Sequence, residues 1–118
     1  MAMTDRQRRG EFAEARAAEL LQQAGFQILL RNYRCRGGEL DIVARRGQLL
    51  LVAEVRLRAS NAFGGAAQSI TGAKRRRMLF ATRYLLARRP QWAQLVVRFD
   101  AILASGEDAP LEWLEAVM

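Results

Sequence analysis

Residues 38–58 read GELDIVARRGQLLLVAEVRLR, and this stretch decides the fold. Polar and apolar residues alternate over 39–45, which is typical of a half-buried strand, and 48–58 contain a continuous apolar run. Arg46 and Gly47 stand between these two segments and favour a two-residue turn. The stretch therefore predicts an antiparallel hairpin of two long strands.

The alternation also predicts which side chains share a face of this hairpin. With Arg46 and Gly47 as the turn, Asp41 lies opposite Val52 and diagonally across from Glu54. A register shift of two residues keeps both carboxylates on one face, whereas a shift of one residue separates them. In the first strand we expect one face to carry Leu40, Ile42 and Ala44, and the other face to carry Glu39, Asp41 and Val43.

Glu54 is the unusual member of the acidic pair because it directly follows the apolar run 49–53. A carboxylate beside a core strand is costly unless it forms an ion pair or binds a cation. Two converging carboxylates suit Mg²⁺ or Mn²⁺, hard cations that activate water and neutralise charge on a phosphate. The alternative is an ordinary ion pair of Glu54 with Arg56, Arg58 or Arg31, and the spacing leaves both interpretations open.

The rest of the chain predicts an α/β fold. The expected segments are helices over 5–24 and 73–89, strands over 26–33, 95–103 and 111–117, and loops over 34–38 and 59–72. The resulting order, α-β-β-β-α-β-β, predicts a mixed sheet flanked by helices. The sequence shows no internal repeat and no linker, so we expect a single domain over residues 1–118.

One acidic residue of the first helix is expected near the sheet. The apolar stripe of this helix consists of Ala13, Ala17, Leu20, Leu21 and Ala24. At 100° per residue, Glu14 falls at the edge of that stripe. Glu14 is therefore a candidate third carboxylate of a metal site, and the alternative is a residue at the boundary of the buried helix face.

Composition excludes several classes of protein and of catalyst. The 118 residues are 51% hydrophobic, which is ample for one packed core. No apolar run approaches the ~20 residues that span a bilayer, so we expect a cytoplasmic protein. The absence of histidine excludes Ser-His-Asp and Cys-His catalysis and the usual zinc and iron sites. The single Cys35 excludes an internal disulfide, so any chemistry uses carboxylates, hydroxyls, lysine or arginine.

Positive charge is unevenly distributed along the chain. Residues 1–98 hold all 19 basic residues and seven of the 12 acidic residues, and the overall net charge is +7. A basic body favours a polyanionic partner, most often nucleic acid, although an arginine-rich genome would give the same composition. The candidate contacts to backbone phosphates are Arg34, Arg36, Arg75, Arg76, Arg77 and Arg83.

Taken together, three stretches resemble a known family. They are Gly38-Glu39-Leu40-Asp41-Ile42-Val43, Val52-Ala53-Glu54-Val55-Arg56 and Phe63-Gly64-Gly65-Ala66-Ala67 followed by Lys74. With Ala13-Glu14 and Arg31-Asn32-Tyr33, they resemble the YraN-like family of bacterial proteins over nearly the whole chain. That family is similar in pattern to the PD-(D/E)XK nucleases and to archaeal Holliday-junction resolvases. The resemblance therefore implies a restriction-endonuclease-like core.

The resemblance also implies roles for single residues. Asp41 takes the place of the metal-binding aspartate, Glu54 that of the acidic residue in the E-x-K motif, and Glu14 that of a helix carboxylate. The motif lysine is Arg56 here, which can stabilise a phosphate but cannot act as a general base. Lys74 lies on the sheet-facing side of the second helix, and we hypothesise that it reaches the acidic site as a relocated lysine. A lysine that extends to solvent at a helix start is the alternative.

Three hypotheses for function follow. The first is an endonuclease that cleaves DNA phosphodiesters with Mg²⁺ or Mn²⁺, acting on branched or damaged DNA in repair or recombination. Gln68, in the loop before the second helix, is a further candidate catalytic residue in this case. The second is a nucleic-acid-binding module on the same fold that does not hydrolyse its ligand. The third is a homodimeric interaction protein whose acidic cluster is only an ion-pair network.

Overall fold

The computed structural model describes residues 2–58 and 70–118 and confirms a mixed α/β fold. Its elements, in order, are α1 (Asp5–Gln23), β1 (Gln27–Cys35), β2 (Gly38–Arg46), β3 (Leu49–Leu57), α2 (Gly72–Arg88), the 3-10 helix η2 (Pro90–Trp92), β4 (Val96–Ala104) and β5 (Glu112–Leu114). The expected order of helices and strands is confirmed, with η2 as an addition. None of the helices in the described part of the chain is long and apolar enough to cross a membrane.

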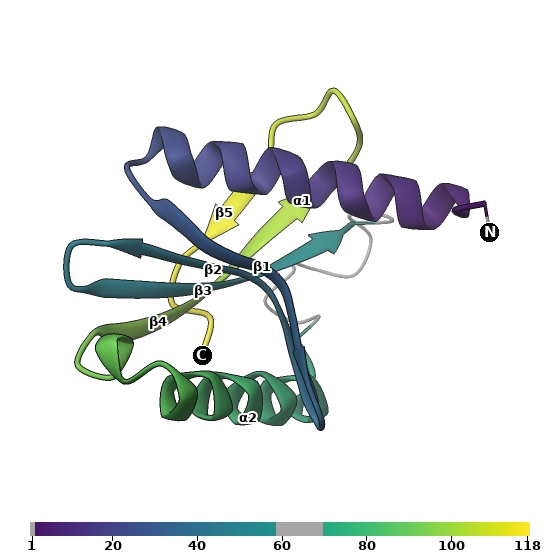
Figure 1. Ribbon diagram of the computed structural model, residues 1–118. Coiled ribbons are helices and arrows are strands. Elements are labelled where there is room, and N and C mark those ends of the chain that lie inside the picture. Colours follow the sequence, from purple (N-terminus) through teal and green to yellow (C-terminus); the bar gives the residue numbers. More distant parts are fainter. Residues whose placement is uncertain (1, 59–69) are drawn as a thin grey trace.

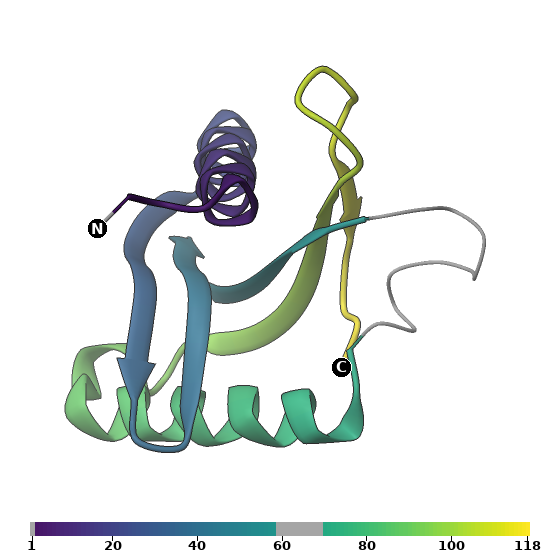
Figure 2. The same cartoon turned by 90° about the vertical axis from the view of Figure 1, so that its right-hand side faces the viewer.

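The five strands form one mixed sheet in the order β1-β2-β3-β4-β5. β3 and β4 are parallel, and the other neighbouring pairs are antiparallel. Helix α1 covers one face of the sheet and α2 covers the other (Figures 1 and 2). β3 lies at the centre of the sheet, and its residues 50–54 are buried.

Each helix packs on the sheet through its own group of apolar side chains. On the α1 side, the buried residues include Ala17, Leu21, Ile42, Leu51 and Ala53. On the α2 side, they include Leu40, Val43, Val52, Met78 and Leu85. These two groups hold the helices against the sheet.

Short polar signals set the helix ends. Thr4 caps α1 in a capping box, in which its side chain accepts a hydrogen bond from Gln7 N and the Gln7 side chain accepts one from Thr4 N. Thr71 caps α2 by accepting a hydrogen bond from Lys74 N. Pro90 stands two residues after the end of α2 and begins η2, as expected for a residue that cannot continue the helix.

The turn between β2 and β3 differs from the expected one by one residue. Gly47 and Gln48 form the turn, and Arg46 pairs with Leu49, so the register is shifted by two residues. Gly47 has φ +60°, which favours glycine at the first position of a tight hairpin turn. Val52 therefore lies opposite Val43 rather than opposite Asp41. A shift of two residues preserves the faces, and Asp41 and Glu54 remain neighbours.

Two predicted segment boundaries were wrong. The loop expected over 34–38 is mostly strand, because β1 continues to Cys35 and β2 begins at Gly38. The last strand spans only Glu112–Leu114, since Ala116 adopts φ +52° and its N–H donates to Asp100 instead of to a ladder partner. The predicted loop 59–72 lies largely outside the described residues.

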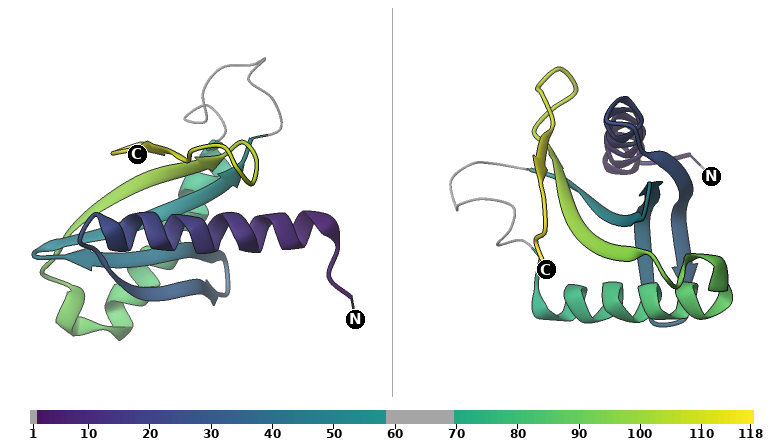
Figure 3. Two further views of the ribbon diagram at one scale, coloured as in Figure 1. Left: turned by 90° about the horizontal axis from the view of Figure 1, so that it is seen from above. Right: turned by 90° about the vertical axis from the view of Figure 1, so that its left-hand side faces the viewer.

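The hairpin of β1 and β2 bends toward α2, which overturns one predicted face. Leu40 packs with the α2-side core, whereas Ile42 packs with the α1-side core. Asn32 on β1 lies across from Asp41, the residue between Leu40 and Ile42. It has φ +54°, a backbone conformation that breaks the regular alternation. The curled end of this hairpin is visible from two sides in Figures 2 and 3.

Candidate functional site

The site lies where β2 and β3 separate. Their ladder of paired residues ends at Ile42 and Ala53. One residue further, the Asp41 carboxylate takes over the role of a backbone acceptor, because its Oδ2 accepts a hydrogen bond from Val55 N at 2.8 Å. Asp41 is thereby fixed beside Glu54, at a point where the two strands no longer pair.

Glu54 is a buried carboxylate with incomplete hydrogen bonding. Its side chain is 5% exposed, and Oε1 lies 3.3 Å from Lys74 Nζ and 3.8 Å from Arg56 Nη1. Its other oxygen, Oε2, is buried and has no hydrogen-bond partner among the described residues. An acceptor left unsatisfied in a buried position is costly, so the site is not a fully satisfied ion-pair network.

The surroundings of Glu54 also disfavour its charge. Burial, followed by the charge of the neighbouring Asp41, raises the pKa of the Glu54 carboxyl from 4.5 to about 7, while Lys74 acts in the opposite direction. Carboxylates with a pKa near neutrality occur frequently at functional sites, where burial is tolerated for chemistry.

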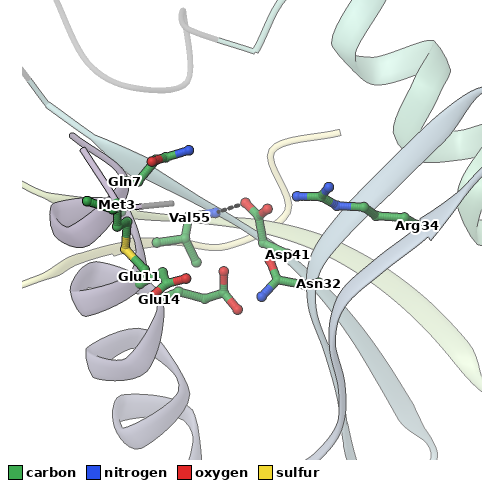
Figure 4. A pocket seen from close by; sticks show the side chains of 10 residues that line it. Met3, Gln7, Glu11, Glu14, Asn32, Arg34, Asp41 and Val55 are labelled. Carbon is green, nitrogen blue, oxygen red and sulfur yellow. Dashed lines mark hydrogen bonds between the residues drawn. The ribbon is translucent and has the colours of Figure 1, made fainter. Parts of the chain in front are cut away.

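Glu14 enters the same region from α1. It lines a pocket of about 670 Å³ together with Asp41, Glu11, Asn32 and others, and Figure 4 shows Glu14 extending into this pocket from α1 while Asp41 is directed at Val55 N. Glu14 is 7% exposed, and burial raises the pKa of its carboxyl group. Its Oε1 accepts a hydrogen bond from Arg31 Nε at 3.1 Å, so this carboxylate has a cationic partner.

Arg56 lines a second pocket that adjoins the first. This pocket, of about 430 Å³, contains both Glu54 and Arg56 and shares Gln7 and Val55 with the larger one. The start of α1 therefore overlies both carboxylates of β2 and β3. The other two arginines proposed as ion-pair partners of Glu54 lie elsewhere: Arg31 binds Glu14, and Arg58 binds Glu112.

Lys74 reaches the site from the first turn of α2. Its side chain is 15% exposed, and its ammonium group lies 3.3 Å from Glu54 and 3.9 Å from Glu39. The helical phase of Lys74 in the sequence predicted this direction, and the structure places the side chain beside the acidic pair rather than in solvent. A cation on a long side chain is thus held next to a carboxylate with an unsatisfied oxygen.

The donor set fits a hard divalent cation with few protein ligands. No group of three or more His, Cys, Asp or Glu side chains able to hold a metal occurs among residues 2–58 and 70–118. Mg²⁺ is usually bound through one or two carboxylates, with water and substrate phosphate completing its shell. Asp41 and the unsatisfied Oε2 of Glu54 match that pattern, whereas Glu14 is engaged by Arg31.

The predicted phosphate contacts occupy two adjoining places. Arg34 and Arg36 lie at the end of the hairpin of β1 and β2, and their side chains are exposed. The other four are exposed along α2: Arg75, Arg76, Arg77 and Arg83. Gln68 lies outside the described residues.

Two neighbours of the site were not among the predicted site residues. Asn32 lines the pocket because of its left-handed backbone, and an asparagine in a strand-like run is the only hint of this. Glu39 approaches Lys74 because the hairpin bends, which strand alternation does not encode.

Comparison with known proteins identifies the family. Residues 13–104 match the model of "Uncharacterised protein family UPF0102". The chain is 46% identical over 109 residues to a UPF0102 protein of Xanthomonas oryzae pv. oryzae strain PXO99A, covering 92% of this chain and 89% of that protein. It is 40% identical over 118 residues to a UPF0102 protein of Pseudomonas putida KT2440, covering 98% and 95% of the two chains. The chain therefore belongs to the UPF0102 family.

Proposed function

We propose that this protein is a metal-dependent endonuclease that cleaves DNA phosphodiesters. The observation that carries the proposal is the orphaned Oε2 of Glu54, buried beside Asp41 at the point where β2 and β3 separate. A structural ion pair is expected to satisfy both oxygens of a buried carboxylate. A buried carboxylate oxygen that accepts no hydrogen bond is instead available to coordinate a metal cation.

Each residue of the site has a separate role in this proposal. Asp41 and Glu54 would hold Mg²⁺ or Mn²⁺, and the ion, when bound, would supply an activated water and neutralise charge on the phosphate. Lys74, 3.3 Å from Glu54, donates hydrogen bonds to the phosphate oxygens or orients the water. Arg56 adds a permanent positive charge from the adjoining pocket but cannot accept a proton.

Glu14 has a positioning role in this proposal. Its carboxylate holds Arg31 and contributes negative charge to the pocket that contains Asp41. The exposed arginines of α2 and of the hairpin bind backbone phosphates without reading sequence. This combination favours a ligand selected by its structure, such as a branched, nicked or single-stranded DNA.

The proposal is tested by cleavage of labelled single-stranded, duplex, flapped and four-way-junction DNA with Mg²⁺, with Mn²⁺ and with EDTA. Asp41→Ala/Glu54→Ala protein, prepared identically, controls for contaminating nuclease, and Glu19→Ala on the exposed side of α1 is the matched control. We expect metal-dependent cutting that the double variant loses and the control retains. Equal cutting by all proteins, or none by any, contradicts the proposal. Binding without cutting would favour the nucleic-acid-binding module instead.

A further inference from the structure

The side of α2 next to the turn between β1 and β2 carries a feature that the acidic site does not use. Phe80 and Tyr84 are exposed at 50% and 36%, large values for aromatic side chains on a helix. Their rings are stacked, with centroids 6.4 Å apart and an angle of 19° between the planes. The guanidinium carbon of Arg88 lies 4.4 Å from the centre of the Tyr84 ring. The pair is therefore a partly exposed aromatic surface, with Arg88 packed over the Tyr84 ring.

These rings belong to a stripe along the helix. Arg77, Phe80, Tyr84 and Arg88 are spaced by three or four residues, so they share one side of α2, away from the buried Met78 and Leu85. The helix holds no acidic residue, and its basic residues are Lys74, Arg75, Arg76, Arg77, Arg83 and Arg88. The two aromatic side chains are therefore flanked by arginines, with no acidic residue on the helix.

The hairpin of β1 and β2 extends this surface. Its turn lies against α2, as Figure 2 shows, and a Cβ atom at Gly37 would stand 3.3 Å from the Phe80 ring. At Gly38 a Cβ would collide with the backbone oxygen of Arg77. This close approach brings the turn, in which the exposed Arg36 precedes Gly37, against Phe80, whereas Arg34 pairs with Glu39 and lines the pocket that contains Asp41.

We propose that Phe80 and Tyr84 form a stacking platform for the unpaired bases of a nucleic-acid strand whose backbone leads to the acidic site. Exposed aromatic rings among basic residues are the usual means of holding single strands, because every base has a π-face and every phosphate a charge. Tyr84 lies ten residues beyond Lys74, about 15 Å along the helix, which roughly four stacked nucleotides span. The inference rests on the proposed function and names its substrate as a strand with unpaired bases.

Charge decides between this ligand and a second copy of the chain. A two-fold dimer through this face would bring the same basic side chains of two helices together, which is repulsive. A polyanionic strand is attracted by those side chains, and its bases cover the apolar rings. The chemistry is shared by single-stranded DNA and RNA.

Binding of labelled strands in EDTA tests the platform independently of cleavage. The probes are a 20-nucleotide oligo-dT, oligo-U of the same length, a 20-base-pair duplex and an abasic strand that keeps the phosphates but lacks bases. The variant is Phe80→Ala/Tyr84→Ala, with Phe80→Trp/Tyr84→Phe as its conservative counterpart. Phe12→Ala is the matched control, since Phe12 is 47% exposed on α1.

We expect the alanine pair to weaken oligo-dT or oligo-U binding about fivefold or more, since stacking contributes about 1–3 kcal/mol per base. The alanine pair should leave binding of the abasic strand and the salt dependence of affinity unchanged. The conservative variant should bind oligonucleotides as the wild type does. The tighter of the two base-bearing strands identifies the natural ligand.

Unchanged oligonucleotide binding by the alanine pair overturns the inference, as does an equal loss with the abasic strand. So does a wild-type dimer, seen by sedimentation, that the alanine pair converts to a monomer. Ring-dependent binding without metal-dependent cleavage would retain the platform and reject the proposed nuclease. Metal-dependent cleavage without ring-dependent binding would retain the proposed nuclease and reject the platform.

Discussion

Replacing Glu54 by glutamine isolates the buried charge at the centre of the site. A glutamine side chain has nearly the shape of a protonated glutamic acid, so Glu54→Gln protein resembles the wild type at low pH. Burial and the neighbouring Asp41 raise the pKa of the Glu54 carboxyl from 4.5 to about 7, although Lys74 opposes this. The charged form is therefore disfavoured in the folded protein relative to the unfolded chain.

The raised pKa fixes the sign of the stability effect. A carboxyl group of this kind contributes stability that is fully present below pH 4.5 and is lost as the pH rises through 7. Between pH 5 and pH 8, the wild type should lose about 2 to 3 kcal/mol of unfolding free energy relative to Glu54→Gln protein. The variant is then the more stable of the two at pH 8.

Denaturant unfolding measures this difference, with the fluorescence of Trp92 and Trp113 as the signal and EDTA present to remove metal. Glu39→Gln is the matched control, because Glu39 also approaches Lys74 but its side chain is 51% exposed. We expect this control to change stability by less than about 0.5 kcal/mol at any pH. A Glu54→Gln protein that is less stable than the wild type at pH 8 would refute the reasoning and make Glu54 a structural ion-pair residue.

Three further outcomes follow from the described contacts. Mg²⁺ or Mn²⁺ at about 100 times its dissociation constant should stabilise the wild type by about 2.7 kcal/mol at pH 8, and thermal melts should show no such gain for Asp41→Asn. Asp100→Asn should cost about 3–5 kcal/mol in guanidinium unfolding, because fully buried Asp100 binds Arg98 through both carboxylate oxygens, and a loss below about 1 kcal/mol would contradict this. Arg31→Met should destabilise the protein at pH 8 by about 1–3 kcal/mol, since it leaves buried Glu14 unpaired, and the loss should decrease on acidification as Glu14 binds a proton; a loss that does not vary with pH would point to packing instead.

The acidic pair was predictable because strand alternation is insensitive to a register shift of two residues. The predicted turn, Arg46 and Gly47, lies one residue before the observed turn, Gly47 and Gln48, so the observed register differs from the predicted one by two residues. An even shift leaves each side chain on its face, so Asp41 and Glu54 stayed together. Lys74 was also predictable in direction, because the phase of an amphipathic helix is set by its buried residues.

The bend of the β1 and β2 hairpin was not predictable from the pattern. It depends on the left-handed backbone of Asn32 and on the close packing of Gly38 against α2, a contact between segments far apart in sequence. That bend moves Leu40 to the α2 side and brings Glu39 to Lys74. Alternation describes a regular strand and carries no information about such a contact.

Binding of Mn²⁺ to the metal-free protein at pH 8, followed by the loss of the free-ion EPR signal, tests the metal site most directly. The wild type should bind the ion, and Asp41→Asn and Glu54→Gln should bind it at least about tenfold more weakly, since each variant lacks one of the two carboxylate ligands. Because Glu54→Gln protein is expected to be the more stable fold at this pH, its loss of binding cannot be attributed to unfolding. Glu19→Gln, changed at an exposed position of α1, should bind as the wild type does. Equal Mn²⁺ binding by all four proteins would contradict a metal site at Asp41 and Glu54.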